Sequence, residues 1–81
     1  MYTYITFKAT RAPKIVESGL DLEEAMYRAS ALYDKGKICI NNEPLVTGVT
    51  VMVVPDQVAI DLEKAGTLPP RFNADFQCGG Y

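Results

Sequence analysis

The sequence predicts an α+β fold, a small two-layer sandwich in which one main helix packs on one face of a three- to four-stranded, mostly antiparallel sheet. Residues 21–35 place apolar side chains at three- and four-residue spacing, which is typical of an amphipathic helix. The segments on either side are rich in β-branched and aromatic residues and favour strands. With 81 residues, 48% of them hydrophobic, the chain can bury one core and form one domain.

Both ends of the main helix can be recognised in the sequence. Asp21 is expected to cap the first turn, and Glu24, three residues later, completes a capping box. Lys35 places a cation at the negative end of the helix, and Gly36 can adopt the left-handed conformation that ends it. The stripe expected to face the sheet consists of Leu22, Ala25, Met26, Ala29, Leu32 and Tyr33.

The segment before the helix is expected to contain one or two strands. Residues 2–9 favour a strand, because apolar and polar side chains alternate along them. Residues 10–13 are interpreted as a turn, since Pro13 has no N–H to donate to a sheet. Residues 14–17 are either a short second strand paired with the first or an extended loop.

The segment after the helix is expected to return to strands. Residues 37–41 favour a strand, and residues 41–44 favour a tight turn that begins with two asparagines. Residues 46–54 favour another strand, in which Gly48 indicates a bulge. The later half of this strand is apolar without alternation, which is typical of a strand covered on both faces.

A short second helix is expected over residues 56–65, with Asp56 as its cap and Gly66 as its end. Its apolar side consists of Val58, Leu62 and Ala65. Two prolines follow and the periodicity stops. The sequence therefore predicts a single domain over residues 1–66 and an extended C-terminal tail, containing proline and glycine, over residues 67–81.

The composition argues against catalysis. The chain has no histidine, which excludes Ser-His, Cys-His and histidine–metal sites, and it has no Walker loop or dinucleotide-binding motif. Cys39 and Cys78 can form at most one disulfide, and two reduced thiols are expected; they cannot form a zinc site alone. We therefore expect no enzymatic activity, no cofactor and no metal.

Charge and hydropathy limit the partners and the location. The formal net charge of −2 disfavours nucleic acid as a partner. No apolar run is long enough to span a bilayer, and no secretory leader opens the chain, so a cytoplasmic protein is expected. Lys8, Arg11 and Lys14 lie near two tyrosines, Tyr2 and Tyr4, an arrangement that can stack bases. A charged edge strand that prevents aggregation is the preferred interpretation of this basic cluster.

The outer side of the main helix is the first candidate binding surface. Glu23, Tyr27, Ser30 and Asp34 fall on one line opposite the apolar stripe. An aromatic residue between carboxylates is typical of an interface hot spot with its polar rim. The alternative is an ordinary solvated helix face with one exposed tyrosine.

The C-terminal tail is the second candidate surface. Phe72, Phe76 and Tyr81 lie in a stretch without periodicity, and aromatic side chains are unfavourable in water. They are expected to dock either on the domain's own sheet or on another chain. In the second case the tail is a partner-binding or dimerising arm. The opposite charges of the basic cluster and the acidic helix also permit a homodimer.

A helix followed by residues 37–46 (KICINNEPLV), with Gly79-Gly80 near the end of the chain, resembles the small β-grasp sulfur carriers. Those proteins are similar to ubiquitin and act through a C-terminal diglycine. The resemblance implies a carrier role that requires Gly80 to become the last residue. This sequence departs from the pattern, because Tyr81 follows the glycines and because the helix at 56–65 and the Pro-Pro segment are additional.

These observations lead us to expect a small, non-catalytic protein that binds another macromolecule, preferably a protein with a basic surface. It is interpreted as an accessory or inhibitory module, like the phage proteins that modulate host proteins by surface occlusion. One alternative is a ligand-binding or sequestering protein with its site at a subunit interface. The other is the β-grasp carrier.

Overall fold

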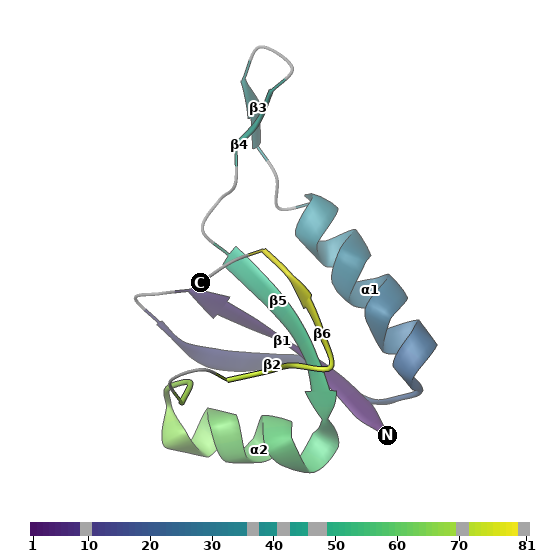
Figure 1. Ribbon diagram of the computed structural model, residues 1–81, viewed down its shortest axis with the longest axis vertical. Coiled ribbons are helices and arrows are strands. Elements are labelled where there is room, and N and C mark those ends of the chain that lie inside the picture. The colour runs from purple at the N-terminus through teal and green to yellow at the C-terminus, as the bar shows by residue number, and fades with distance from the viewer. Residues whose placement is uncertain (9–10, 36–37, 41–42, 46–48, 70–71, 80–81) are drawn as a thin grey trace.

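Four strands of the computed structural model form one antiparallel sheet in the order β2-β1-β5-β6 (Figure 1). The structure describes residues 1–8, 11–35, 38–40, 43–45, 49–69 and 72–79. The strands of this sheet are β1 (Tyr2–Lys8), β2 (Arg11–Leu20), β5 (Val49–Pro55) and β6 (Phe76–Cys78). Two helices pack on it, α1 (Leu22–Lys35) and α2 (Asp56–Ala65), which confirms the expected α+β class.

The two helices lie on opposite faces of the sheet. On β5, Val51 and Val53 pack against α1, whereas Met52 and Val54 pack against α2. All four side chains are buried, so the prediction of a strand covered on both faces is confirmed. The sheet is the middle of three layers. The sequence predicted the two layers formed by α1 and the sheet, and α2 adds a third.

The prediction for α1 is confirmed in its bounds and, except for Leu22, in its buried side. Asp21 Oδ1 accepts a hydrogen bond from the Glu24 N–H at 2.8 Å and so caps the first turn. Leu22, the first residue of the helix, is exposed, whereas the rest of the predicted stripe packs on the sheet. Those packed residues are Ala25, Met26, Ala29, Leu32 and Tyr33. Gly36 lies outside the described residues.

The predicted turn at residues 10–13 is wrong from Arg11 onward. β2 begins at Arg11 and contains Pro13, which is buried. Because β2 is an edge strand with a single neighbour, a proline that donates no hydrogen bond is tolerated there. Residues 14–17 are part of the same strand, which decides between the two alternatives for them.

A β-bulge in β2 changes which face each of its side chains occupies. Tyr4 lies opposite Glu17 and Ile5 lies opposite Ile15, so Val16 is an extra residue on β2. Residues that lie opposite each other share a face of the sheet. The bulge therefore places Glu17 on the α1 face with Tyr4, and Ile15 on the α2 face with Ile5.

The strand expected at residues 37–41 does not join the main sheet. Among the residues that the structure describes, β3 (Ile38–Ile40) pairs with β4 (Glu43–Leu45) in a separate two-stranded sheet, drawn beyond the end of α1 in Figure 1. Glu43 and Pro44, expected in a turn, belong to β4, where proline is tolerated because both strands are edges. Asn41, Asn42 and Gly48 lie outside the described residues.

The second helix has the predicted bounds. Gly66 ends α2 with a φ of 73°, and its N–H donates to the Leu62 carbonyl at 3.0 Å. The predicted cap is wrong, because Pro55 occupies the N-cap position and Asp56 is the first helical residue. Leu62 is buried as expected, whereas Ala65 is exposed.

The C-terminal segment contributes the last strand of the sheet. Phe76 lies opposite Val53 and Cys78 lies opposite Val51, although no regular structure was expected there. These residues pair because β5 presents an unpaired backbone edge to them. Leu68, Phe72 and Ala74 pack on the α2 face before the chain enters β6.

Candidate functional site

The outer face of α1 presents an exposed aromatic side chain between carboxylates. Ala25 and Ala29 are fully buried against the sheet, and the opposite side of the helix faces solvent. Tyr27 lies on that side and is 73% exposed, the largest value among the large hydrophobic side chains of the described residues. Glu23 and Asp34 are exposed on the same helix, so these three residues form the outer face of α1 as predicted.

Ser30, the fourth residue of the predicted line, does not belong to this exposed face. It is half-buried, and its Oγ lies 3.8 Å from the Sγ of Cys78 on β6. The Cys78 side chain is a free thiol, also half-buried. The prediction failed because β6 was not expected, so nothing in the sequence indicated that this side of the helix is covered.

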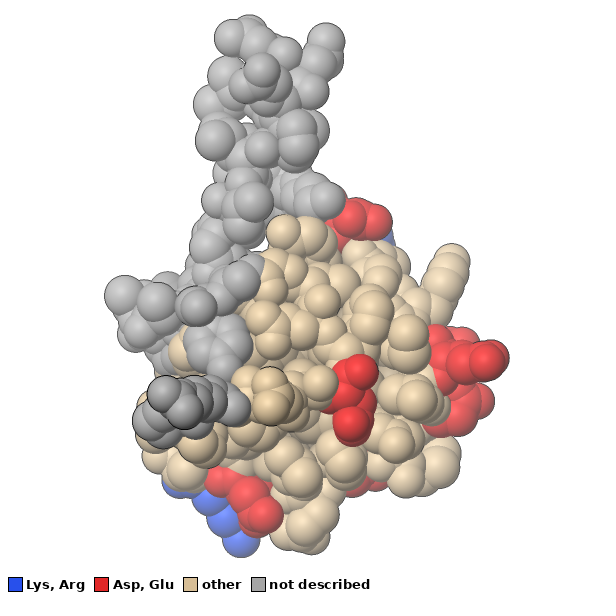
Figure 2. Space-filling view, viewed as in Figure 1, with Lys and Arg blue, Asp and Glu red and all other residues tan. Residues whose placement is uncertain are grey.

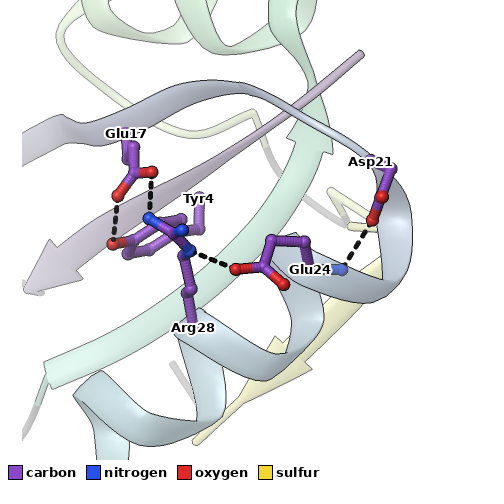
Figure 3. A network of polar contacts seen from close by, with 5 residues as sticks. All are labelled: Tyr4, Glu17, Asp21, Glu24 and Arg28. Atoms are coloured by element: carbon purple, nitrogen blue, oxygen red, sulfur yellow. Dashed lines mark hydrogen bonds and ion pairs between the residues drawn. The ribbon is translucent and has the colours of Figure 1, made fainter.

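A polar network joins α1 to β2 (Figure 3). The guanidinium of Arg28 binds two carboxylates, that of Glu24 one turn earlier on α1 and that of Glu17 on β2. The Arg28 Nε to Glu24 Oε1 distance is 2.7 Å. The hydroxyl of Tyr4 donates to the other Glu17 oxygen at 3.3 Å. The carboxylate of Glu17 therefore binds both Arg28 of α1 and Tyr4 of β1.

The contacts of this network raise the pKa of two of its members, Arg28 and Tyr4. Hydrogen bonds to Glu24 and then to Glu17 raise the pKa of Arg28, so its positive charge is constant. Burial, followed by the negative charge of Glu17 and its hydrogen bond, raises the pKa of Tyr4. The Tyr4 phenol therefore stays neutral and keeps donating to Glu17.

A shallow groove of about 280 Å³ runs along α1 beside this network. Its lining is Tyr4, Tyr27, Arg28, Ala31, Leu32 and Lys35. The polar groups of Arg28 and Lys35 come from positions two turns apart, with apolar surface between them. The groove is open to solvent, which suits a side chain from another molecule better than an enclosed small ligand.

Carboxylates outnumber cations around α1. The described acidic residues on this side are Glu17, Asp21, Glu23, Glu24 and Asp34, and the basic residues are Arg28 and Lys35. Figure 2 shows Asp and Glu on the right-hand side of the molecule, where Figure 1 places α1, and also at the centre and the lower left of this view. Since Arg28 is bound by two of these carboxylates, the surface around Tyr27 attracts cations.

Two aromatic residues of the tail, Phe72 and Phe76, lie on the domain itself. Phe72 is half-buried and packs on the α2 face, and Phe76 is half-buried and packs on the α1 face. The first of the two alternatives for these side chains, docking on the domain's own sheet, therefore describes both. Tyr81 and Gly80 lie outside the described residues, so the carrier alternative stays a prediction.

The basic cluster is separated from the tyrosines that the sequence placed near it. Lys8 lies opposite Arg11 at one end of the β1–β2 pair, whereas Tyr2 lies opposite Leu20 at the other end. Tyr4 is buried and its hydroxyl binds Glu17, so its ring is not free to stack on a base. Lys14 is exposed on the edge strand β2, as the edge-strand interpretation expects.

Beyond the exposed residues of α1, only one contact of this site follows from the sequence. The Glu24–Arg28 pair has the i,i+4 spacing of a helical ion pair and can be recognised from sequence. No sequence pattern indicated the ion pair between Glu17 and Arg28, because this pair depends on the bulge at Val16. The groove also depends on Tyr4, whose position beside α1 follows from the strand register.

Comparisons with known proteins assign neither a family nor a function to the chain. The chain matches no protein-family model, no curated protein and no solved structure. In the part of the chain that the structure describes, no group of three or more Cys, Asp or Glu side chains is placed to hold a metal ion. No helix in that part has the length and apolar character needed to cross a membrane.

Proposed function

We propose that this chain is a small, non-catalytic protein-binding module whose outer α1 face covers a basic surface of another protein. It acts by occlusion, so that the partner surface is no longer accessible to its other ligands. The observation that carries the proposal is Tyr27, an aromatic side chain that is 73% exposed on a helix anchored by two fully buried alanines. Tyrosine is among the residues most enriched at interface hot spots.

The position of Tyr27 supports the proposal beyond its exposure. The helix that carries it is capped by Asp21 and tied to β2 through the Arg28–Glu17 pair, so the backbone that carries Tyr27 is held in place before binding. Prior ordering lowers the conformational entropy lost on association. An exposed tyrosine in this setting costs less to immobilise in an interface than one on a loop.

The charge of the surface supports a basic partner. Carboxylates around Tyr27 attract a positively charged surface and increase the rate of encounter, an effect that salt screens. The rate of association is therefore expected to fall when the ionic strength is raised from about 0.1 M to about 1 M. A purely apolar interface does not show this dependence.

The proposal is tested by quantitative affinity capture from the source cells with a tagged chain. We compare the wild type with Tyr27→Ala and Glu23→Lys, and Ile60→Ala serves as the matched control because Ile60 is an exposed apolar residue on α2. A partner is expected to be retained by the wild type and by Ile60→Ala, and to fall about tenfold or more with the two α1 variants. Equal recovery of every captured protein by all four chains refutes the proposal.

A further inference from the structure

The groove beside Tyr27 has the form of an anchor pocket. It has about 280 Å³, enough for one large side chain, and its central lining is the half-buried Leu32 and the exposed methyl group of Ala31. Tyr27 adds an exposed aromatic side chain to the lining, which also includes the buried Tyr4. An apolar side chain that enters this groove removes several apolar groups from water at once.

The charged residues that line the groove are the cations Arg28 and Lys35, but the carboxylates around it outnumber them and favour a cationic occupant. At one end Arg28 is bound by Glu17 and Glu24, so that end carries one more negative than positive charge. At the other end Lys35 stands in the last turn of α1, where the helix dipole carries partial negative charge. The neighbouring exposed carboxylates of Glu23 and Asp34 extend the negative surface beyond the groove.

Together, these features define one class of occupant. Resting on the proposed function, we infer that the groove accepts one large apolar side chain from a lysine- or arginine-rich segment of the partner protein. The apolar side chain packs against Leu32, Ala31 and Tyr27. The flanking cations of the segment lie over the carboxylates of Glu17, Glu24 and Glu23.

A groove-filling variant tests the apolar anchor. The probe is a fluorescein-labelled synthetic peptide of lysine and leucine in an amphipathic order, and binding is measured by fluorescence anisotropy. Ala31→Trp fills the groove from an exposed helical position, and Ala65→Trp, exposed on α2, is the matched control. We expect Ala31→Trp to weaken binding about tenfold or more and Ala65→Trp to leave it unchanged.

Changes in the peptide test whether its leucine side chains act as the apolar anchor. A peptide with serine in place of leucine is expected to bind about tenfold or more weakly, because it lacks the anchor. Wild-type protein that does not bind the leucine peptide, or that binds both peptides equally, overturns the inference. An equal effect of the two tryptophan variants also overturns it.

The sign of the charge effect is tested at Arg28. Arg28→Gln removes a positive charge from the lining and leaves Glu17 and Glu24 without their cation, so the lysine peptide is expected to bind several-fold more tightly. A groove that instead captures a carboxylate through Arg28 and Lys35 gives the opposite result. In that case Arg28→Gln weakens binding, a peptide with glutamate in place of lysine binds better, and the inference is wrong.

The inference and the proposed function fail in different ways. If Tyr27→Ala and Glu23→Lys abolish partner capture while Ala31→Trp does not, the outer face binds a partner without using the groove. If none of these variants changes capture, the proposed function itself fails. Circular dichroism of each variant confirms that α1 is still folded.

Discussion

At the residue scale, one buried hydroxyl ties three elements together. Thr3 on β1 is fully buried, and its Oγ1 lies 2.5 Å from Asp56 Oδ1 at the start of α2. The same carboxylate oxygen accepts from the Gly19 N–H on β2 at 3.4 Å, and Thr3 Oγ1 also lies 3.0 Å from Ser18 Oγ. Asp56 therefore connects the beginning of α2 to two strands, a role that a helix cap does not have.

This arrangement predicts a loss of stability in acid. The hydrogen bond from Thr3 is the main reason that the pKa of Asp56 lies below its ordinary value of 3.8. A lowered pKa in the folded state stabilises the fold above that ordinary value, and the stabilisation is lost as the pH falls through the folded-state pKa. We expect Asp56→Asn to flatten the acid side of the stability–pH curve, measured by urea unfolding between about pH 2 and about pH 7.

Thr3→Val serves as the companion variant, since it keeps the carboxylate and removes its principal donor. Its acid dependence is expected to lie between those of the wild type and Asp56→Asn. If the difference in unfolding free energy between wild type and Asp56→Asn is the same at both ends of the pH range, the Thr3–Asp56 bond does not lower the pKa of Asp56.

At the element scale, α1 combines a local start signal with a tertiary attachment. The cap by Asp21 is local, because its oxygen binds an N–H three residues later. The Arg28–Glu17 pair is tertiary, because it connects the helix to β2. Its side chains are about two-fifths exposed, so solvent screens the pair, and its main effect is to orient the helix.

The cap predicts a measurable loss when its oxygen is removed. Asp21→Ala is expected to lower the free energy of unfolding by about 1 kcal/mol, because the Glu24 N–H loses its acceptor. Asp21→Ser keeps a capping oxygen and is expected to retain most of that stability. Thermal unfolding followed by circular dichroism measures both, and equal losses for the two variants indicate that the cap contributes nothing.

The strand β6 predicts that the tail stabilises its own domain. Phe76→Ala is expected to lower the free energy of unfolding by about 2 kcal/mol, less than for a fully buried phenylalanine because Phe76 is half-buried. Tyr27→Ala is the matched aromatic control, and its exposure predicts a change within about 0.5 kcal/mol. Denaturant titration of the monomer measures both changes. A Phe76→Ala monomer as stable as the wild type assigns Phe76 to an intermolecular contact instead.

At the scale of the whole molecule, β1 and β5 contribute buried side chains to two hydrophobic cores, one on each face of the sheet. Tyr4 and Val53 belong to the cluster under α1, and Ile5 and Met52 belong to the cluster over α2. Because adjacent residues of the same strands serve both clusters, neither helix can lose its packing surface without affecting the other. The two cores are therefore expected to unfold together.

One variant in each core tests this cooperativity. Val53→Ala, on the α1 face, and Leu62→Ala, on α2, are each expected to lower the free energy of unfolding by about 2 kcal/mol or more. Native-state hydrogen exchange is expected to show the same decrease in protection for the amides of α1 and α2 in both variants. Independent decreases, each confined to one helix, contradict a single cooperative unit.

Features encoded within a few residues were predictable from the sequence. The cap at Asp21, the three- and four-residue spacing of α1, and the left-handed Gly66 after α2 each involve groups less than two turns apart. The apolar run at residues 51–54 also indicated a strand covered on both faces, because neither side of it offers polar groups to solvent. Local interactions decided these elements, so local patterns predicted them.

The tertiary structure alone decided how the candidate surface is assembled. The bulge at Val16 places Glu17 beside Arg28, the pairing of β6 with β5 covers Ser30, and the strand register brings Tyr4 to the groove. Each depends on strand pairing between residues far apart in the chain, which side-chain patterns along one segment do not encode. The sequence by itself determined the helices, the strands β1, β3 and β5 and the outer position of Tyr27, whereas the pairing of distant backbone groups determined what lies around it.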